Sequence, residues 1–248
     1  MNLAPAFTID AATVEARYAP FFAQTLHVPV LCIHIQLPTT TVLVDAGLNE
    51  SDIPNYQPPP HLLDQMAAAG LDPAAVEHII ITHVHGDHFN ALTVDGDGGY
   101  RLAFPNAKVY LGRADWEKAD VQQDRHDPSS LISRTLEILW QQGRLVLPDG
   151  DLELGPGLRI IHAPGETPGH QLLRVESAGK VLYCVGDLYH HPVEVEQPAW
   201  SVSWSDVAAN LVSRQQLAAR ALTENALLIA THIAGVGHLT GSAEEVTW

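Results

Sequence analysis

Short apolar runs, separated by turns of glycine, proline and polar residues, recur along most of the chain. Their enrichment in β-branched residues is typical of buried strands. The strands predicted in this way are Val28–Leu37, Thr41–Val44, His78–Ile81, Ala107–Leu111, Leu145–Leu147, Asp151–Leu154, Leu158–Ile161, Gln171–Val175, Val181–Val185 and Leu227–Ala230. Segments with helical start and stop signals predict helices at His61–Ala69, Ala114–Gln123, Ser130–Gln142 and Ser205–Glu224.

The order of these elements indicates the fold class. Strands outnumber helices, and the helices fall between groups of strands instead of alternating with them one for one. Two packed sheets with helices outside them satisfy this order, so we predict an α/β fold, a four-layered αββα sandwich. No low-complexity linker interrupts the sequence. We therefore expect one domain over residues 1–248.

A cluster of metal-binding side chains directly follows the predicted strand that ends at residue 81. His83, His85, Asp87 and His88 stand within six residues. In extended chain, residues two apart point the same way, so His83 and His85 can reach one ion together. A turn at Gly86 would carry the next two side chains toward a second position. A purely structural role would crowd three imidazoles and a carboxylate together with no ion to offset their desolvation.

Side chains of the same kind stand at later strand ends and in stiff loops. His170 closes a loop of prolines and glycines, and Asp187 and His232 each follow a predicted strand. Asp45 also ends a strand. Two roles stay open for Asp45: a cap for the next turn, or an acceptor that fixes the ring of a metal-bound histidine.

The charge balance narrows the range of ligands. The 248 residues include 13 Lys and Arg against 29 Asp and Glu, a formal net charge of −16. Such a field repels phosphate backbones and anionic membranes, so we predict no nucleic-acid and no membrane partner. The start of the chain lacks the basic flank and apolar block of a secretory signal. The expectation is a cytoplasmic protein that acts on a small neutral molecule.

The spacing of these groups resembles that of the metallo-β-lactamase-fold hydrolases, whose hallmark is His-x-His-x-Asp-His followed by later His, Asp and His ligands. The resemblance covers the chain from Val42 to His238. Three further stretches resemble the branch that contains methyl parathion hydrolase and the N-acyl homoserine lactonases: Phe104–Ala107, Gly186–His190 and Thr231–His238.

The resemblance implies a role for each of these positions. One metal would be bound by His83, His85 and His170. The other would be bound by Asp87, His88 and His232, with Asp187 bridging the two and Asp45 orienting a ligand. Asp87 and Asp187 are also the predicted catalytic residues. The set favours two divalent ions, although related persulfide dioxygenases hold a single iron. Zinc suits these ligands, and iron, manganese or cobalt also fit.

Two ions about 3.5–4 Å apart can share a water and lower its pKa, which gives a hydroxide nucleophile. We therefore predict a dinuclear metal-dependent hydrolase that cleaves small lactones, carboxylic esters or phosphotriesters with a metal-bridging hydroxide. Two alternatives stay open: a thioesterase like glyoxalase II, although basic residues for its glutathione-like anion are sparse, and a metal-binding or ligand-binding module without turnover. The expected partners are a small-molecule substrate and a second copy in a homodimer.

Two positions depart from the family pattern. Glu166 replaces the middle histidine of the family loop His-x-Pro-Gly-His-Thr-Pro-Gly-His, and we expect it at the surface or bracing the loop, with adjustment of His170 as the alternative. Some lactonases use a tyrosine shortly after the bridging aspartate, and His190 occupies its place here. The candidates for the substrate pocket are Tyr56, which belongs to a proline-rich loop, Phe89, Tyr189, His190 and Trp200.

Overall fold

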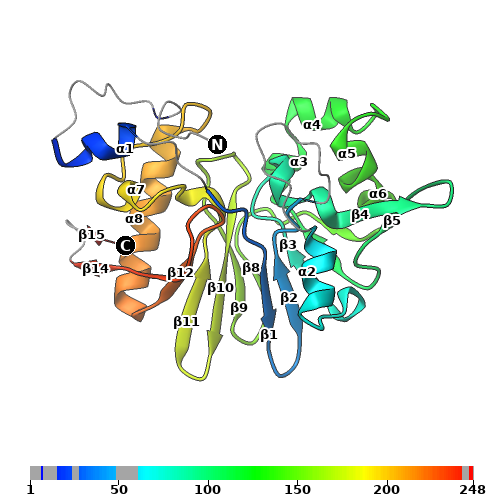
Figure 1. Cartoon of the computed structure of the whole chain (residues 1–248), viewed down its shortest axis with the longest axis horizontal. Coiled ribbons are helices and arrows are strands. Elements are labelled where there is room, and N and C mark those ends of the chain that lie inside the picture. The colour runs from blue at the N-terminus through cyan, green and yellow to red at the C-terminus, as the bar shows by residue number, and fades with distance from the viewer. Residues whose placement is uncertain (1–6, 8–15, 24–27, 49–60, 242–245, 248) are drawn as a thin grey trace.

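The computed structural model describes residue 7 and residues 16–23, 28–48, 61–241 and 246–247. Two sheets stand side by side in the middle of the molecule, with helices on both outer sides (Figure 1). The helices are α1 (Ala19–Ala23), α2 (Leu62–Ala68), α3 (Arg113–Trp116), α4 (Ala119–Asp124), α5 (Leu131–Arg134), α6 (Leu136–Gln141), α7 (Val193–Glu196) and α8 (Val207–Glu224). Within these ranges, no helix has both the length and the apolar composition to cross a bilayer.

The first sheet has the strand order β1-β2-β3-β6-β7. Its strands are β1 (Ile33–Gln36), β2 (Thr41–Val44), β3 (His78–Ile80), β6 (Lys108–Tyr110) and β7 (Leu145–Val146). β1 and β2 form an antiparallel hairpin, whereas β2, β3, β6 and β7 run parallel to one another. A small hairpin of β4 (Thr93–Gly96) and β5 (Gly99–Leu102) lies outside this sheet.

The second sheet has the order β13-β12-β11-β10-β9-β8. Its strands are β8 (Leu152–Gly155), β9 (Leu158–His162), β10 (Gln171–Ser177), β11 (Lys180–Cys184), β12 (Leu227–Ile229) and β13 (Gly237–His238). All neighbours pair antiparallel except β11 and β12, which are joined through α8 and run parallel. A short pair, β14 (Thr240–Gly241) and β15 (Val246–Thr247), follows.

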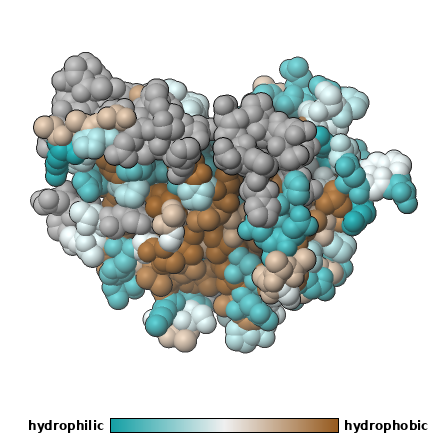
Figure 2. All heavy atoms as spheres, viewed as in Figure 1, coloured by the Kyte–Doolittle hydropathy of each residue, from teal (hydrophilic) through white to brown (hydrophobic). Residues whose placement is uncertain are grey.

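Alternate residues of the central strands pack into different layers, as strand geometry requires. In β2, Leu43 packs with α2 and α6, whereas Val42 faces the second sheet. In β11, Tyr183 packs beneath α8, whereas Cys184 faces the first sheet. These three apolar layers confirm the predicted αββα sandwich. Figure 2 shows hydrophobic residues at the surface between the two sheets.

The carboxyl ends of β2, β3, β11 and β12 lie at one edge of the sandwich, the upper edge in Figure 1. The loops that leave these ends begin after Val44, Ile80, Cys184 and Ile229. Residues far apart in sequence, such as Asp45 and Thr231, therefore meet at this edge.

Several predicted elements are shorter or broken. The predicted strand Val28–Leu37 is regular only over β1, and the predicted helix Ser130–Gln142 is interrupted at Thr135. Thr135 has φ −126° and ψ −83°, and its hydroxyl donates to the Leu131 carbonyl at 2.5 Å, so the side chain competes with the helical backbone. The last predicted helix is confirmed as α8, which Asp206 caps by accepting from the backbone N–H of residues 208 and 209.

Candidate metal centre

The loop after β3 presents the first histidines. His83 is fully buried, and its Nε2 lies 2.8 Å from His85 Nδ1. The chain then turns through a short 3-10 helix, Gly86–His88, which carries Asp87 and His88 to the other side of the loop. His83 and His85 belong to one group of potential ligands, and Asp87 and His88 belong to another.

Asp187 lies in the middle of the histidine cluster. It follows β11 in the 3-10 turn Gly186–Leu188 and is 3% exposed. Its Oδ2 lies close to Nε2 atoms of four histidines: 3.1 Å from His232, 3.3 Å from His88, 3.4 Å from His190 and 3.8 Å from His83. One carboxylate oxygen therefore lies within 3.8 Å of four imidazoles, a position that suits a bridging ligand.

Two groups of potential ligands adjoin each other at this point. The second group consists of Asp87, His88 and His232. Asp87 Oδ1 lies 3.6 Å from His88 Nε2, and Asp87 Oδ2 lies 3.5 Å from His232 Nε2. Its three members coincide with the ligands that the resemblance implies for one ion.

The first group consists of His83, His85, Glu166 and Asp187. This composition differs from the predicted one, because Glu166 joins the group and His170 does not. His170 is fully buried beside it, with its ring centroid 5.3 Å from that of His83. The expectation of a surface position for Glu166 was wrong, because its side chain is buried and its Oε1 lies 3.4 Å from His85 Nδ1. Its expected role as a brace of the loop stays a prediction.

Each of three histidines is tethered through one ring nitrogen, which leaves the other available. His88 Nδ1 lies 2.8 Å from Asp45 Oδ2, His170 Nδ1 lies 3.1 Å from the Ala163 carbonyl, and His232 Nδ1 lies 2.7 Å from the Pro29 carbonyl. An acceptor at Nδ1 fixes the tautomer in which Nε2 carries a lone pair, as a metal ligand requires.

Asp45 and Asp115 brace the loops of the site. Asp45 accepts hydrogen bonds from the backbone N–H and the hydroxyl of Thr82, at 2.8 and 3.0 Å, besides its contact with His88. Its φ of 58° lies in the left-handed region, which Asp tolerates better than most residues. Asp115 accepts from Val84 N–H at 3.0 Å, and from the Thr167 hydroxyl and the residue 169 N–H at 2.7 Å each. It therefore ties the first histidine loop to the loop that carries Glu166.

The electrostatic environment differs within the cluster. Burial lowers the pKa of His83 well below its ordinary value, and the nearby His88 and His85 lower it further. Burial also lowers the pKa of His85 and His170, in each case against the opposing effect of acidic neighbours. These three imidazoles are therefore neutral at neutral pH.

His88 and His232 shift the other way. Burial disfavours their charged forms, but Asp187 and other carboxylates outweigh it and raise the pKa of both imidazoles, well above the ordinary value for His88. Burial alone would raise the pKa of Asp187, but His232 and His88 hold it well below its usual range.

The donor set fits divalent cations. Five buried polar atoms of the cluster have no hydrogen-bond partner among the described residues: His88 Nε2, His170 Nε2, Asp187 Oδ1, Glu166 Oε2 and His190 Nδ1. Buried groups without partners are costly. Imidazole nitrogens and carboxylate oxygens at these positions offer lone pairs of the kind that zinc and similar ions bind.

The predicted substrate-pocket residues fall in different places. Tyr56 lies outside the described residues. Phe89 packs in the core beneath α2–α6, and Tyr189 packs beneath α8, each at most 2% exposed, so their predicted place in the pocket wall is corrected to a packing role. Trp200 packs on Tyr18 in a small cluster near α1.

His190 is the pocket candidate that lies at the site. Its Nε2 lies 3.4 Å from Asp187 Oδ2 and 3.7 Å from Glu166 Oε1, and its ring stacks on His232 with centroids 5.8 Å apart. A buried ion pair holds its backbone: Glu194 accepts from the N–H of His190 and pairs with Arg214. Trp204, which the sequence reading did not single out, is 48% exposed and donates from Nε1 to Glu166.

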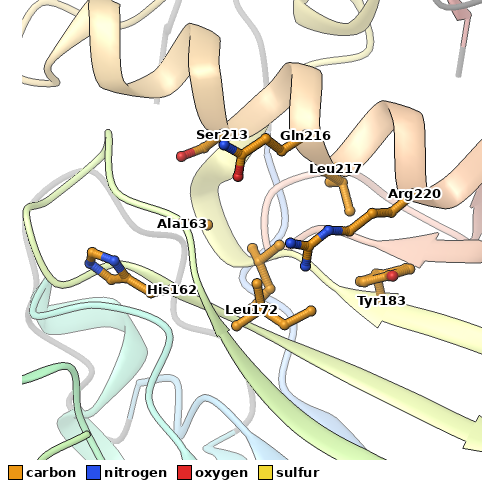
Figure 3. Close-up of a pocket in the computed structure, with 9 residues that line it drawn as sticks. His162, Ala163, Leu172, Tyr183, Ser213, Gln216, Leu217 and Arg220 are labelled. Atoms are coloured by element: carbon orange, nitrogen blue, oxygen red, sulfur yellow. The ribbon is translucent and has the colours of Figure 1, made fainter. Parts of the chain in front are cut away.

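The structure also contains a small pocket apart from this cluster, between α8 and the second sheet (Figure 3). Arg220 extends from α8 over an apolar base that includes Leu172. None of the predicted ligands lines this pocket.

A model of the Metallo-beta-lactamase superfamily matches residues 27–207. The chain belongs to this superfamily. Among curated members of the superfamily, an N-acyl homoserine lactonase of Bacillus sp is 26% identical over 199 residues, which cover 73% of this chain and 72% of that relative. An N-acyl homoserine lactonase of Azorhizobium caulinodans is 28% identical over 164 residues, 63% of this chain and 59% of the relative.

Solved structures of the superfamily share the fold. Hydrolase AbOPH of the beta lactamase superfamily aligns with a TM-score of 0.81 at 19% identity, over 99% of this chain and 88% of that chain. AidC, described as a dizinc quorum-quenching lactonase, aligns with a TM-score of 0.70 at 21% identity, over 88% and 77%. The predicted resemblance, including the lactonase branch, and the predicted class of metal-dependent hydrolase are confirmed.

Proposed function

We propose that the chain is a dinuclear metal-dependent hydrolase that opens the ring of N-acyl homoserine lactones, within a wider range of small esters that includes carboxylic esters and phosphotriesters. The observation that carries the proposal is the meeting of two ligand groups at Asp187. The curated lactonase relatives support the choice of substrate. The acidic charge of −16 agrees with a neutral lactone rather than an anionic substrate.

The proposed ligand assignment follows the two groups. His83 and His85, with His170 beside them, would hold one ion. Asp87, His88 and His232 would hold the other, and Asp187 would contact both. Zinc is the first choice for this nitrogen and oxygen set, with iron, manganese and cobalt as the other candidates.

When bound, two such ions would lower the pKa of water, so that hydroxide is available as the nucleophile, and would polarise the carbonyl oxygen of the lactone. The protein supplies the positioning. Asp45, the Ala163 carbonyl and the Pro29 carbonyl hold three imidazoles with Nε2 turned toward the centre. A ligand fixed in this way does not have to reorganise during the reaction.

Two residues have proposed roles toward the substrate. Asp87 is the more exposed of the two predicted catalytic carboxylates, with 14% of its side chain accessible against 4% for Asp187. We assign to its carboxylate the relay of a proton: it would accept the proton of the hydroxyl group that has added to the carbonyl carbon and deliver it to the leaving alkoxide as the ring C–O bond breaks. His190 projects Nε2 beside Asp187 and would orient the substrate by a hydrogen bond.

The domain organisation, oligomeric state and location are also proposed from the sequence. We predict one hydrolase domain over residues 1–248, a homodimer and a cytoplasmic location.

Metal analysis combined with a substrate panel tests the function. Protein loaded with zinc is assayed on N-hexanoyl homoserine lactone, a chromogenic carboxylic ester, a phosphotriester and a glutathione thioester. We expect two ions per chain and the highest kcat/KM on the lactone. Turnover of the thioester alone would favour the glyoxalase II-like alternative. Two bound ions without turnover of any substrate would favour a binding module and contradict the proposal.

A further inference from the structure

A buried glutamate faces the first ligand group at a position where the family pattern has a histidine. Glu166 lies in the loop between β9 and β10, four residues before His170. The residue as a whole is 3% exposed, and its side chain has no accessible surface. The family pattern gives position 166 no ligand role, so its presence here needs a separate physical reason.

The separation between the Glu166 carboxylate and His85 is that of two ligands on one ion. Glu166 Oε1 lies 3.4 Å from His85 Nδ1 and belongs with His83 and Asp187 to a group whose ligand atoms are all within 4.8 Å of one another. Ligands about 2.0–2.1 Å from a tetrahedral zinc are about 3.3 Å apart, so the first of these separations is that of two ligands on one ion.

The contacts of Glu166 in the described ranges are with one indole and two imidazoles. Trp204 donates one neutral hydrogen bond to Oε1 at 2.5 Å, and Oε2 has no hydrogen-bond partner among the described residues. In the described ranges, the ion-pair contacts of Glu166 are with histidines, His85 and His190, and none is with a lysine or arginine. A buried carboxylate normally has a cation or several donors, because removing it from water is costly.

We propose that Glu166 is an additional ligand of the ion held by His83 and His85. The proposal rests on the dinuclear centre proposed above. Glu166 and Asp187 then give that ion two carboxylates, so it binds more tightly and with a lower net charge than with imidazoles and one aspartate. Trp204 is a positioning residue, because its indole N–H fixes the rotation of the carboxylate.

The test measures metal binding in the full-length protein. Chelator-stripped protein is titrated with Co²⁺ in competition with a chromophoric chelator, and the visible absorption of the bound cobalt is recorded. The variants are Glu166→Gln, which keeps the shape but loses the charge, and Trp204→Phe, which removes only the donor. Glu153→Gln is the matched control, since its side chain is 66% exposed on β8. His85→Ala identifies which of the two dissociation constants belongs to the first ion.

We expect Glu166→Gln to lower the affinity for the first ion at least about a hundredfold and to change the absorption band of the cobalt bound there. The affinity for the other ion should not change. Trp204→Phe should weaken the first ion about tenfold, since partners of metal ligands typically contribute 10–100-fold. Glu153→Gln should match the wild type. If Glu166→Gln does not fold, as circular dichroism would show, the Trp204→Phe result decides.

The outcomes separate this inference from the proposed function. Wild-type protein that binds two ions, with both variants equal to it in affinity and spectrum, would overturn the role of Glu166 and leave the dinuclear centre intact. Wild-type protein that binds no ion would overturn both.

Discussion

The two ligand groups of this centre differ in how the protein prepares them. The histidines of the first group, together with His170, have pKa values lowered by burial, so they are neutral before an ion arrives. Those of the second group, His88 and His232, have pKa values raised by surrounding carboxylates, so an ion that binds them competes with a proton up to a higher pH. The imidazoles of the first group can bind a cation without losing a proton. In the metal-free protein, the carboxylates around the second group favour protonated imidazoles.

Asp187 joins the two halves, so its removal should have the largest effect. We expect Asp187→Ala to abolish full metal loading and lactone turnover, because its Oδ2 lies between His232 and His83 at 3.1 and 3.8 Å. Metal analysis and kcat/KM on one sample check this. Retention of two ions and a normal rate would remove the basis for treating the halves as one centre.

Asp45 and Asp115 should affect the halves unequally, because Asp45 contacts the ring of His88 directly, whereas Asp115 contacts the backbone of the His83–His85 loop and of the loop that carries Glu166. Asp45→Asn removes the carboxylate beside His88 and should lower the affinity for the second ion about 10–100-fold. Asp115→Asn leaves the N–H groups of Val84 and residue 169 with a poorer acceptor and should weaken the first ion over the same range. Chelator competition gives both constants. Equal losses at both ions in both variants would show that the halves do not act independently.

The pH dependence of metal loading should sharpen the comparison. His88 and His232 have raised pKa values in the metal-free protein, and only the neutral imidazole binds metal. The affinity of the second ion should therefore rise with pH until these raised values are passed, by about tenfold per pH unit for each proton released, and then level off. The first ion should show no such rise above pH 6.5, because its imidazoles have lowered pKa values.

Calorimetric titration between pH 6 and 8, in buffers of different ionisation enthalpy, counts the protons released. Release with the second ion only is the expected result. Equal release with both ions would mean that the two halves are protonated alike.

The smallest effect on activity is expected for a substitution of Trp200, and a substitution of His190 should have a larger one. His190→Phe should lower kcat about tenfold without changing the metal content, since His190 contacts Asp187 but is assigned to the substrate. Trp200→Phe should leave kcat/KM within about twofold, because its ring packs on Tyr18, 5.1 Å away, and Phe keeps the aromatic contact. A loss of activity in Trp200→Phe equal to that in His190→Phe would place Trp200 in the substrate pocket after all.

Local spacing made the core of this site predictable. His83, His85, Asp87 and His88 form one loop, and their directions follow from extended backbone and a single turn. The αββα order was predictable for a related reason, because the strand runs have a simple period and the helices are grouped. The ends of the helices and strands were less predictable. Thr135 divides a predicted helix through a hydrogen bond of its hydroxyl, which the apolar pattern does not encode.

The residues missed by sequence reasoning act through distant contacts. Asp115 accepts from the residue 169 N–H, 54 positions away, and Glu166 meets Trp204 across 38 positions. The glutamate in place of the family histidine marked position 166 as unusual. The sequence did not show which way its side chain points, because that depends on the path of the loop. Phe89 and Tyr189 adjoin site residues in sequence, yet their rings face the two outer cores.

Anomalous diffraction from crystals of zinc-loaded protein tests the central claim most directly, because it locates each ion without assuming any ligand. We predict two peaks per chain, one beside His83 and His85 and one beside His88 and His232, each about 2.0–2.2 Å from a carboxylate oxygen of Asp187. A single peak, or two peaks that do not share Asp187, would contradict the account.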